Sequence, residues 1–289
     1  MKQHRNRPGW RLALVGLLIG LISPSGYAEL SADEVAAAYF EPHLIEQGAD
    51  DLALDDAYRL QQRYVNALSA ELGPRTGYKV AMTSLSSQQH FGLSEPLYGQ
   101  FLKKMLLQSP AQLPVNFGAR GLVEADLLVR VGDSGINEVI TVDEVLTHID
   151  AVIPFIELPD PLWSTSLTAA RLVAVNCGAR YGVLGEPIAV SAGPKWQRRL
   201  QAFNVALYGP GDVLLASGNG DDLLSGPLNV VFWLLQRLRS EGVALQPGDL
   251  LSLGSLTAPL SPTIGQYRAV YQGLDSNPVT VNIEFTADE

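Results

Sequence analysis

The clearest pattern along the chain is an alternation of apolar and polar side chains over residues 121–131. Apolar residues take every second position, and Glu124, Asp126 and Arg130 stand between them. Side chains two apart on a strand share a face, so the pattern predicts a strand with both carboxylates on one side, their Cβ atoms about 6–7 Å apart. Two interpretations stay open: a polar face turned to water, or a carboxylate pair that holds one hard cation.

Two further apolar runs each carry one conspicuous charge. Residues 77–83 predict a short strand around Lys79, and residues 151–160 predict an apolar strand around Glu157. A charge in such a setting needs a partner or access to water. Lys79 therefore either extends to solvent from an edge strand or meets a partner. Glu157 either pairs with an arginine in the core or takes part in a cation site.

Helical spacing and turn residues predict the rest of the fold. Ser31 and Glu34 have capping-box spacing and open a helix towards Gly48, where Pro42 kinks or breaks it. Periodicity predicts further helices at 55–72, 84–91, 141–149 and 228–241, and leaves 167–175 undecided between helix and strand. We expect a loop at 92–99, a hairpin of 200–207 with 213–217, and strands at 182–185, 250–253, 268–271 and 279–285.

The first 28 residues have the composition of an export signal. Four basic residues precede an apolar core at 12–22, and a small-residue cleavage site ends at Ala28. The core is shorter than the roughly 20 residues that span a bilayer, although an uncleaved anchor stays the alternative. We therefore expect a mature chain that starts at Glu29, is periplasmic or secreted, and has no membrane association after cleavage.

Charge and cysteine content exclude several classes of function. Loss of the four basic signal residues takes the formal charge from −10 to −14, which argues against a nucleic-acid partner. Cys177 is the single cysteine, so the chain has no internal disulfide and no cysteine-rich zinc site. With 47% hydrophobic and 17% charged residues, the chain is expected to be globular.

The candidate chemistry is that of an oxygen-ligated metal. Glu124, Asp126 and Glu157 form an all-oxygen ligand set that suits Mg²⁺, Mn²⁺ or Ca²⁺ and not zinc. The sequence contains no Gly-x-Ser-x-Gly elbow, and its one cysteine has no nearby histidine, so nucleophilic catalysis has little support. The residues favour a metal that acts as a Lewis acid on an oxo acid.

At these residues the chain resembles the 2-keto-4-pentenoate hydratase and 4-oxalocrotonate decarboxylase branch of the fumarylacetoacetate hydrolase superfamily. The resemblance runs from about residue 54 to 285. It is specific in the order and spacing of its segments, not in any one of them. The segments are 77–83, 123–126, 155–158 with Asp160, 173–176, 227–228, 233–234, 247–249 and 254–255.

The resemblance implies an α+β fold: a mixed-β roll of the superfamily's C-terminal-domain type at 76–289, with outer helices and an N-terminal helical subdomain at 29–75. It implies Mg²⁺ or Mn²⁺ at Glu124, Asp126 and Glu157, and a lyase of hydratase or decarboxylase type that acts on a small 2-oxo acid through a metal-stabilised enolate. Lys79 would be the catalytic residue. Lys79, Asn176 and Ser255 would bind the substrate, and we expect a homo-oligomer.

The chain departs from the family pattern at three positions. Asp126 stands where a longer Glu is usual, and Leu97 and Val175 stand where relatives commonly carry an acid. Metal binding is therefore better supported than the full proton-transfer machinery. Two alternatives stay open: a non-catalytic periplasmic protein that binds small oxo or dicarboxylic acids, and an acylpyruvate C–C hydrolase that would use His90 with an unidentified partner.

Overall fold

The computed structural model describes residues 30–49 and 52–288. The expected signal peptide and its cleavage site lie outside these residues. Within them, every helix is too short or too polar to cross a bilayer.

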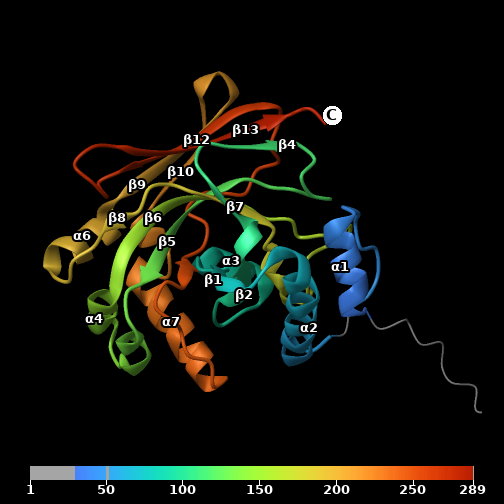
Figure 1. The fold of residues 1–289 in the computed structure, drawn as a ribbon, viewed down its shortest axis with the longest axis horizontal. Coiled ribbons are helices and arrows are strands. Elements are labelled where there is room, and N and C mark those ends of the chain that lie inside the picture. The colour runs from blue at the N-terminus through green and yellow to red at the C-terminus, as the bar shows by residue number, and fades with distance from the viewer. Residues whose placement is uncertain (1–29, 50–51, 289) are drawn as a thin grey trace, which may run out of the picture.

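Two β-sheets form the body of the molecule (Figure 1). The larger has the order β2-β1-β11-β5-β6-β7-β3, with β8 paired to β6, and the smaller has the order β10-β9-β12-β13-β4. The strands of the larger sheet are β1 (Arg75–Ala81), β2 (Leu97–Leu102), β3 (Leu106–Gln108), β5 (Glu124–Val131), β6 (Ile149–Leu158), β7 (Tyr181–Leu184), β8 (Ile188–Ala189) and β11 (Leu250–Ser252). Those of the smaller are β4 (Ala111–Pro114), β9 (Asn204–Gly209), β10 (Val213–Asn219), β12 (Gly265–Gln272) and β13 (Val279–Thr286).

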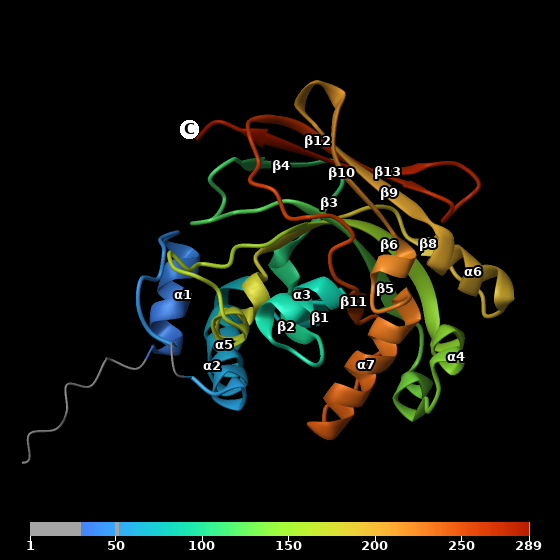
Figure 2. The same ribbon diagram turned by 180° about the vertical axis from the view of Figure 1, so that it is seen from behind.

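The larger sheet is mixed, because β11 pairs in parallel with β1 on one side and antiparallel with β5 on the other. Strands β5 and β6 form its long antiparallel centre. Figures 1 and 2 show the small sheet lying above this curved centre, with most helices below it or at its sides. The expected α+β class with a mixed-β roll and outer helices is confirmed.

The helices gather in two groups. On one side of the roll, α1 (Ala32–Phe40), α2 (Leu54–Leu72) and α5 (Ala169–Ala174) lie together (Figure 2). On the other side lie α4 (Val142–Val145), α6 (Pro194–Ala202) and α7 (Pro227–Ser240), and the short α3 (Leu85–Phe91) follows β1. The capping box at Ser31 forms as expected, and the residues left undecided at 167–175 contain helix α5.

Two hydrophobic cores meet at strand β5. Leu127 and Val129 pack into the core between the two sheets, whereas Leu128 faces the core formed with α1, α2 and α5. Both faces of the strand are therefore buried over most of its length, and Glu124 and Asp126 do not form a water-facing surface, whereas Arg130 near its end is partly exposed. The N-terminal helices share their core with β2 and α5, so they close the roll on one side.

Two sequence-based predictions of local structure are wrong. The expected loop at 92–99 contains the start of β2, whose residues are all buried and show no alternation to reveal a strand. The first arm of the predicted hairpin begins too early, because residues 200–202 end helix α6 and the strand starts at Asn204. The hairpin of β9 and β10 itself is confirmed.

Candidate active site

The register of β5 and β6 brings the three predicted carboxylates together. Glu124 lies directly opposite Glu157 in the antiparallel pair, and Asp126 lies opposite Phe155. Directly opposed side chains share a face with Cβ atoms about 4.5–5.5 Å apart, and residues two apart on one strand share it as well. All three carboxylates therefore point from the same face at one end of the central strand pair.

These carboxylates are withdrawn from water. Glu124, Asp126 and Glu157 are 8%, 0% and 1% exposed. Burial and then the charge of Glu157 raise the pKa of Glu124 to about 8, against the opposing effect of Lys79. The same two causes raise the pKa of Asp126 well above its ordinary value, although hydrogen bonds oppose them. Both carboxyl groups therefore lack a counter-charge that would stabilise their ionised forms, and protons neutralise them more readily than usual.

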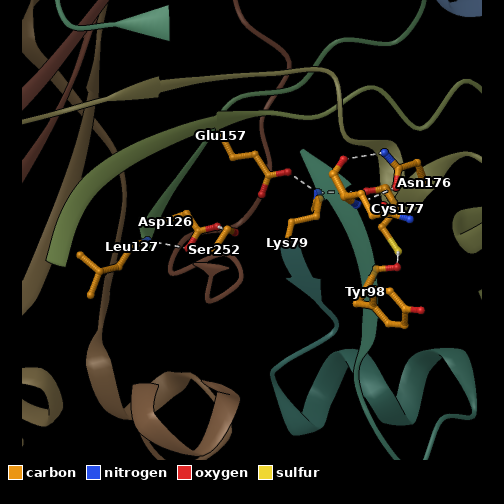
Figure 3. Close-up of polar contacts among 9 residues, drawn as sticks. Lys79, Tyr98, Asp126, Leu127, Glu157, Asn176, Cys177 and Ser252 are labelled. Atoms are coloured by element: carbon orange, nitrogen blue, oxygen red, sulfur yellow. Dashed lines mark hydrogen bonds and ion pairs between the residues drawn. The ribbon is translucent and has the colours of Figure 1, made fainter. Parts of the chain in front are cut away.

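Lys79 on β1 is the one cation among these groups. Its ammonium donates to Glu157 Oε1 in a short, buried ion pair and to the carbonyl of Cys177 at 3.0 Å. Burial lowers the pKa of Lys79, but the charges of Glu157 and Glu124 more than offset this and the net shift is upward. Figure 3 shows Lys79 and Glu157 pointing towards each other from separate strands. The solvent-exposed alternative for Lys79 is thus excluded.

Asp126 has different partners. One of its oxygens accepts a short hydrogen bond from Ser252 on β11, and the other accepts from the Leu127 amide at 2.5 Å. Both contacts lie to one side of the Lys79–Glu157 pair in Figure 3. Neither Ser252 nor the Leu127 amide carries a charge, so no counter-charge stabilises the ionised form of Asp126.

The residue set fits a divalent cation, although the side chains do not yet encircle one. Glu157 Oε2 is buried and accepts no hydrogen bond, and three carboxyl groups face one lysine, so their full ionisation would call for about two further positive charges. Across residues 30–49 and 52–288, however, no three His, Cys, Asp or Glu side chains are arranged to hold a metal as they stand. Glu157 turns to Lys79 and Asp126 to Ser252, so binding requires a rotation of these side chains.

A cavity of about 590 Å³ opens onto the carboxylates. Its polar floor contains Lys79, Glu124, Glu157 and Ser255, whose hydroxyl also lies 2.5 Å from the carbonyl of Thr257. Asp126 lies behind this floor and does not line the cavity. The remaining wall is mainly apolar and contributes Val80, Ala81, Met82, Phe91, Leu122, Pro159, Pro161, Leu167, Leu172, Leu256, Ala258 and Pro259. A small organic acid with an apolar chain matches this lining.

Asn176, like Asp126, is a predicted site residue that does not line the cavity. It is fully buried, and its side chain accepts from the Gln100 amide at 2.7 Å and donates to the Gln100 carbonyl at 2.8 Å. Both Asn176 and Cys177 have positive φ angles, at 57° and 51°. Asn176 therefore holds a left-handed turn that directs the Cys177 carbonyl to Lys79 (Figure 3).

Two contributors to the site were missed by the sequence reasoning. The carbonyl of Cys177 and the hydroxyl of Ser252 contact Lys79 and Asp126 directly. A backbone carbonyl has no side-chain signature. Ser252 could have been suspected only as a polar residue in the apolar strand that leads to 254–255.

The chain is similar in sequence to two hydratases that act on small 2-oxo acids by name. No family model matches the chain. In sequence it is 29% identical over 212 residues to a 2-keto-4-pentenoate hydratase from Paraburkholderia xenovorans (strain LB400), covering 71% of this chain and 75% of the relative. It is 27% identical over 220 residues to a 2-oxo-hept-4-ene-1,7-dioate hydratase from Escherichia coli, covering 73% of this chain and 79% of the relative.

The fold is shared with solved structures of the same kind. A 4-oxalocrotonate decarboxylase from Pseudomonas putida G7, complexed with magnesium and adipate, superimposes with a TM-score of 0.78 at 22% identity, covering 88% of this chain and 95% of the other. A fumarylpyruvate hydrolase from Pseudomonas aeruginosa, complexed with Mn²⁺ and pyruvate, gives 0.53 at 15% identity, covering 74% and 90%. Sequence and fold together therefore confirm that the chain resembles the 2-keto-4-pentenoate hydratase and 4-oxalocrotonate decarboxylase branch of the fumarylacetoacetate hydrolase superfamily.

Proposed function

We propose that this protein is a divalent-metal-dependent lyase, of hydratase or decarboxylase type, that acts on a small 2-oxo acid. One observation carries the proposal: Glu124 and Glu157, the latter with an oxygen that accepts no hydrogen bond, share a cavity floor with a single lysine, and a third buried carboxylate, Asp126, lies behind them. The sequence relatives are named as hydratases, and the structural neighbour with the higher TM-score is a decarboxylase.

Mg²⁺ or Mn²⁺ is the proposed cofactor, with Glu124, Asp126 and Glu157 as its protein ligands. Solved neighbours are complexed with magnesium, calcium and Mn²⁺. Carboxylate oxygens suit these hard cations, and one divalent ion would supply the positive charge that three ionised carboxylates beside one lysine lack. When bound, the metal would act as a Lewis acid that stabilises negative charge developing on the oxo oxygen of the substrate.

Lys79 has the position to orient the substrate and to move a proton. Its ammonium lies at the cavity floor with two acceptors, Glu157 and the Cys177 carbonyl, so a third donor position can meet a substrate carboxylate. Charge-assisted contacts in a buried site are stronger than those between neutral groups. The apolar wall lowers the local dielectric around them, which strengthens both contacts.

A non-catalytic binding protein is the second candidate, because acid/base groups are sparse. Leu97 and Val175 are buried in the apolar core and neither lines the cavity. Burial raises the pKa of Cys177 to about 12, so its thiol is not a ready base. For the hydrolase alternative the structure offers no support, since His90 is exposed and no histidine lines the cavity among the described residues.

Turnover separates the two candidates. Purified protein with Mg²⁺ should consume 2-keto-4-pentenoate, followed by loss of its ultraviolet absorbance, and Glu157→Gln should abolish this reaction. The variant keeps an oxygen that can accept from Lys79 but removes the charge partner of this buried lysine, so circular dichroism should first verify that it folds. Binding of pyruvate or oxalate without turnover of any unsaturated 2-oxo acid would favour the binding protein.

We propose in addition that the protein is exported and acts in the periplasm or outside the cell. The basic residues, short apolar core and small-residue site at the start of the chain support this. N-terminal sequencing of protein from its native host should begin at Glu29. Soluble cytoplasmic protein that retains Met1 would overturn the proposal.

We also propose that the protein forms a homo-oligomer that binds neither nucleic acid nor membrane after signal cleavage. Light scattering coupled to gel filtration would give the assembled mass. A monomer at micromolar concentration would overturn the oligomer proposal.

A further inference from the structure

The cavity has an unusual balance of charge. Of the described residues that line it, the charged ones are Lys79, Glu124, Glu157 and Asp222, which makes one cation against three carboxylates. Lys79 is already bound to Glu157 and to the Cys177 carbonyl. Once a 2-oxo acid places its own carboxylate on the floor, no cation of this lining remains for a second anionic group.

The rest of the cavity offers little to a second carboxylate. Most of the wall is aliphatic, aromatic or proline side chain. Hydroxyl groups occur near the start of α3, but they bond largely to one another: Ser84 Oγ lies 3.1 Å from Ser86 Oγ and 2.8 Å from Ser87 Oγ, and Ser87 Oγ donates to the Ser84 carbonyl at 2.8 Å. A carboxylate there would lose water without gaining a charged partner.

Asp222 adds a negative charge that would repel a second carboxylate on a bound acid. It ends the turn at 220–222, is exposed, and accepts a hydrogen bond from the Asn219 amide at 2.9 Å. The turn is fixed to the cavity wall two residues later, where the Leu224 amide donates to the Thr83 carbonyl at 3.0 Å. Asp222 is therefore an exposed carboxylate in the cavity lining, fixed through the backbone of its turn.

We infer that the substrate is a 2-oxo acid with a single carboxylate and an uncharged, apolar chain, and that Asp222 is a residue that selects against diacids. The inference rests on the proposed function, because it assumes that the 2-oxo acid end binds at the floor. Resemblance does not decide the matter, since the relatives are named for both a monoacid and a diacid. The inference therefore rests on the charged residues that line the cavity.

Two ligands of equal chain length test the inference. Calorimetric titration of the Mg²⁺-loaded protein should show 2-oxopentanoate binding roughly 30-fold or more tighter than 2-oxopentanedioate, the scale expected when one charge is left unpaired in a partly buried site. Equal affinity, or tighter binding of the diacid, would overturn the inference and leave the proposed function intact. If neither acid binds, the proposed function fails and the inference fails with it.

A matched pair of variants tests the role of Asp222. Asp222→Asn keeps the acceptor for the Asn219 amide and should tighten diacid binding by roughly two- to fivefold, the range for an exposed charge, with monoacid binding unchanged. Asp221→Asn removes the same charge from an exposed neighbour that does not line the cavity, and should change neither affinity. Equal effects of the two substitutions would show only a general charge effect and would remove Asp222 from the selective role.

Discussion

Two buried carboxylates at the end of β6 have opposite surroundings. Asp160 Oδ2 accepts from the Ala119 amide at 2.8 Å and lies 3.4 Å from the Arg180 guanidinium, and its Oδ1 accepts from the Arg120 amide at 2.9 Å. Glu157, three residues earlier, has one lysine and an oxygen that accepts nothing. A carboxylate with every acceptor position used holds a fold together, whereas one with a free position is available for a ligand.

The arginine beside Asp160 strengthens this contrast. Arg180 also donates to the carbonyls of Phe117 and Tyr39, at 2.5 and 3.0 Å, and its guanidinium stacks 4.5 Å from the Tyr39 ring. It thus ties helix α1 to the roll. Lys79 has no comparable set of structural partners, and both of its contacts lie at the cavity floor.

The largest expected effect is the loss of stability when Asp160, the fully hydrogen-bonded carboxylate, is removed. Asp160→Ala should lower the free energy of unfolding by about 3–5 kcal/mol, because it leaves the buried Arg180 without its charge partner. Urea unfolding followed by fluorescence measures this. The matched control is Asp150→Ala, which breaks the exposed pair with Arg130 and should cost less than about 1 kcal/mol. Similar losses of unfolding free energy in the two variants would show that Asp160 contributes no more to stability than an exposed ion pair does.

The stabilisation that a bound metal gives should depend on Glu157, the carboxylate with an oxygen that accepts no hydrogen bond. Mg²⁺ at 100 times its dissociation constant should raise the free energy of unfolding of the wild type by about 2.7 kcal/mol, through binding to the native state alone. Thermal or urea unfolding of chelator-stripped Glu157→Gln should show no such gain. An undiminished gain in that variant would place the metal elsewhere.

The smallest of the three effects concerns the lysine. Lys79→Met should weaken binding of oxalate, a 2-oxo acid mimic, by roughly 10- to 150-fold, because a charge-assisted hydrogen bond contributes about 1.5–3 kcal/mol. Mg²⁺ affinity in the absence of oxalate should not fall, because the substitution removes a positive charge and frees Glu157 from its ion pair. Calorimetry on both ligands separates the two affinities, and a loss of oxalate binding below about threefold would remove Lys79 from substrate contact.

Local sequence patterns predicted the elements that have a clear period or stop signal. Helix α2 was expected at 55–72 and is Leu54–Leu72, because its apolar spacing is regular and Gly73 follows it. Strand β2 was missed since it is buried on both faces and contains Gly99. A Cβ at Gly99 would lie 2.5 Å from the Asn176 carbonyl, so this glycine marks a close approach of two backbones and not a loop.

The candidate site was only partly accessible to the same reasoning. Alternation placed Glu124 and Asp126 on one face correctly, and the lone charges of Lys79 and Glu157 flagged both residues. That Glu157 lies opposite Glu124 depends on strand register, which no local pattern specifies. The position of Asn176 was equally hidden, because only the folded chain shows that its amide is used up by Gln100.

The place of β11 in the larger sheet has a consequence for folding. Residues 250–252 lie between β1 and β5, so the middle of the sheet comes from near the end of the chain. Until those residues are available, the Lys79 strand and the carboxylate strand have no common neighbour, and Asp126 lacks the Ser252 hydroxyl. Such long-range closure is slow compared with local pairing. We therefore expect the charged centre to assemble late in folding, and a truncation that removes 250–252 to leave β1 and β5 without the strand that joins them.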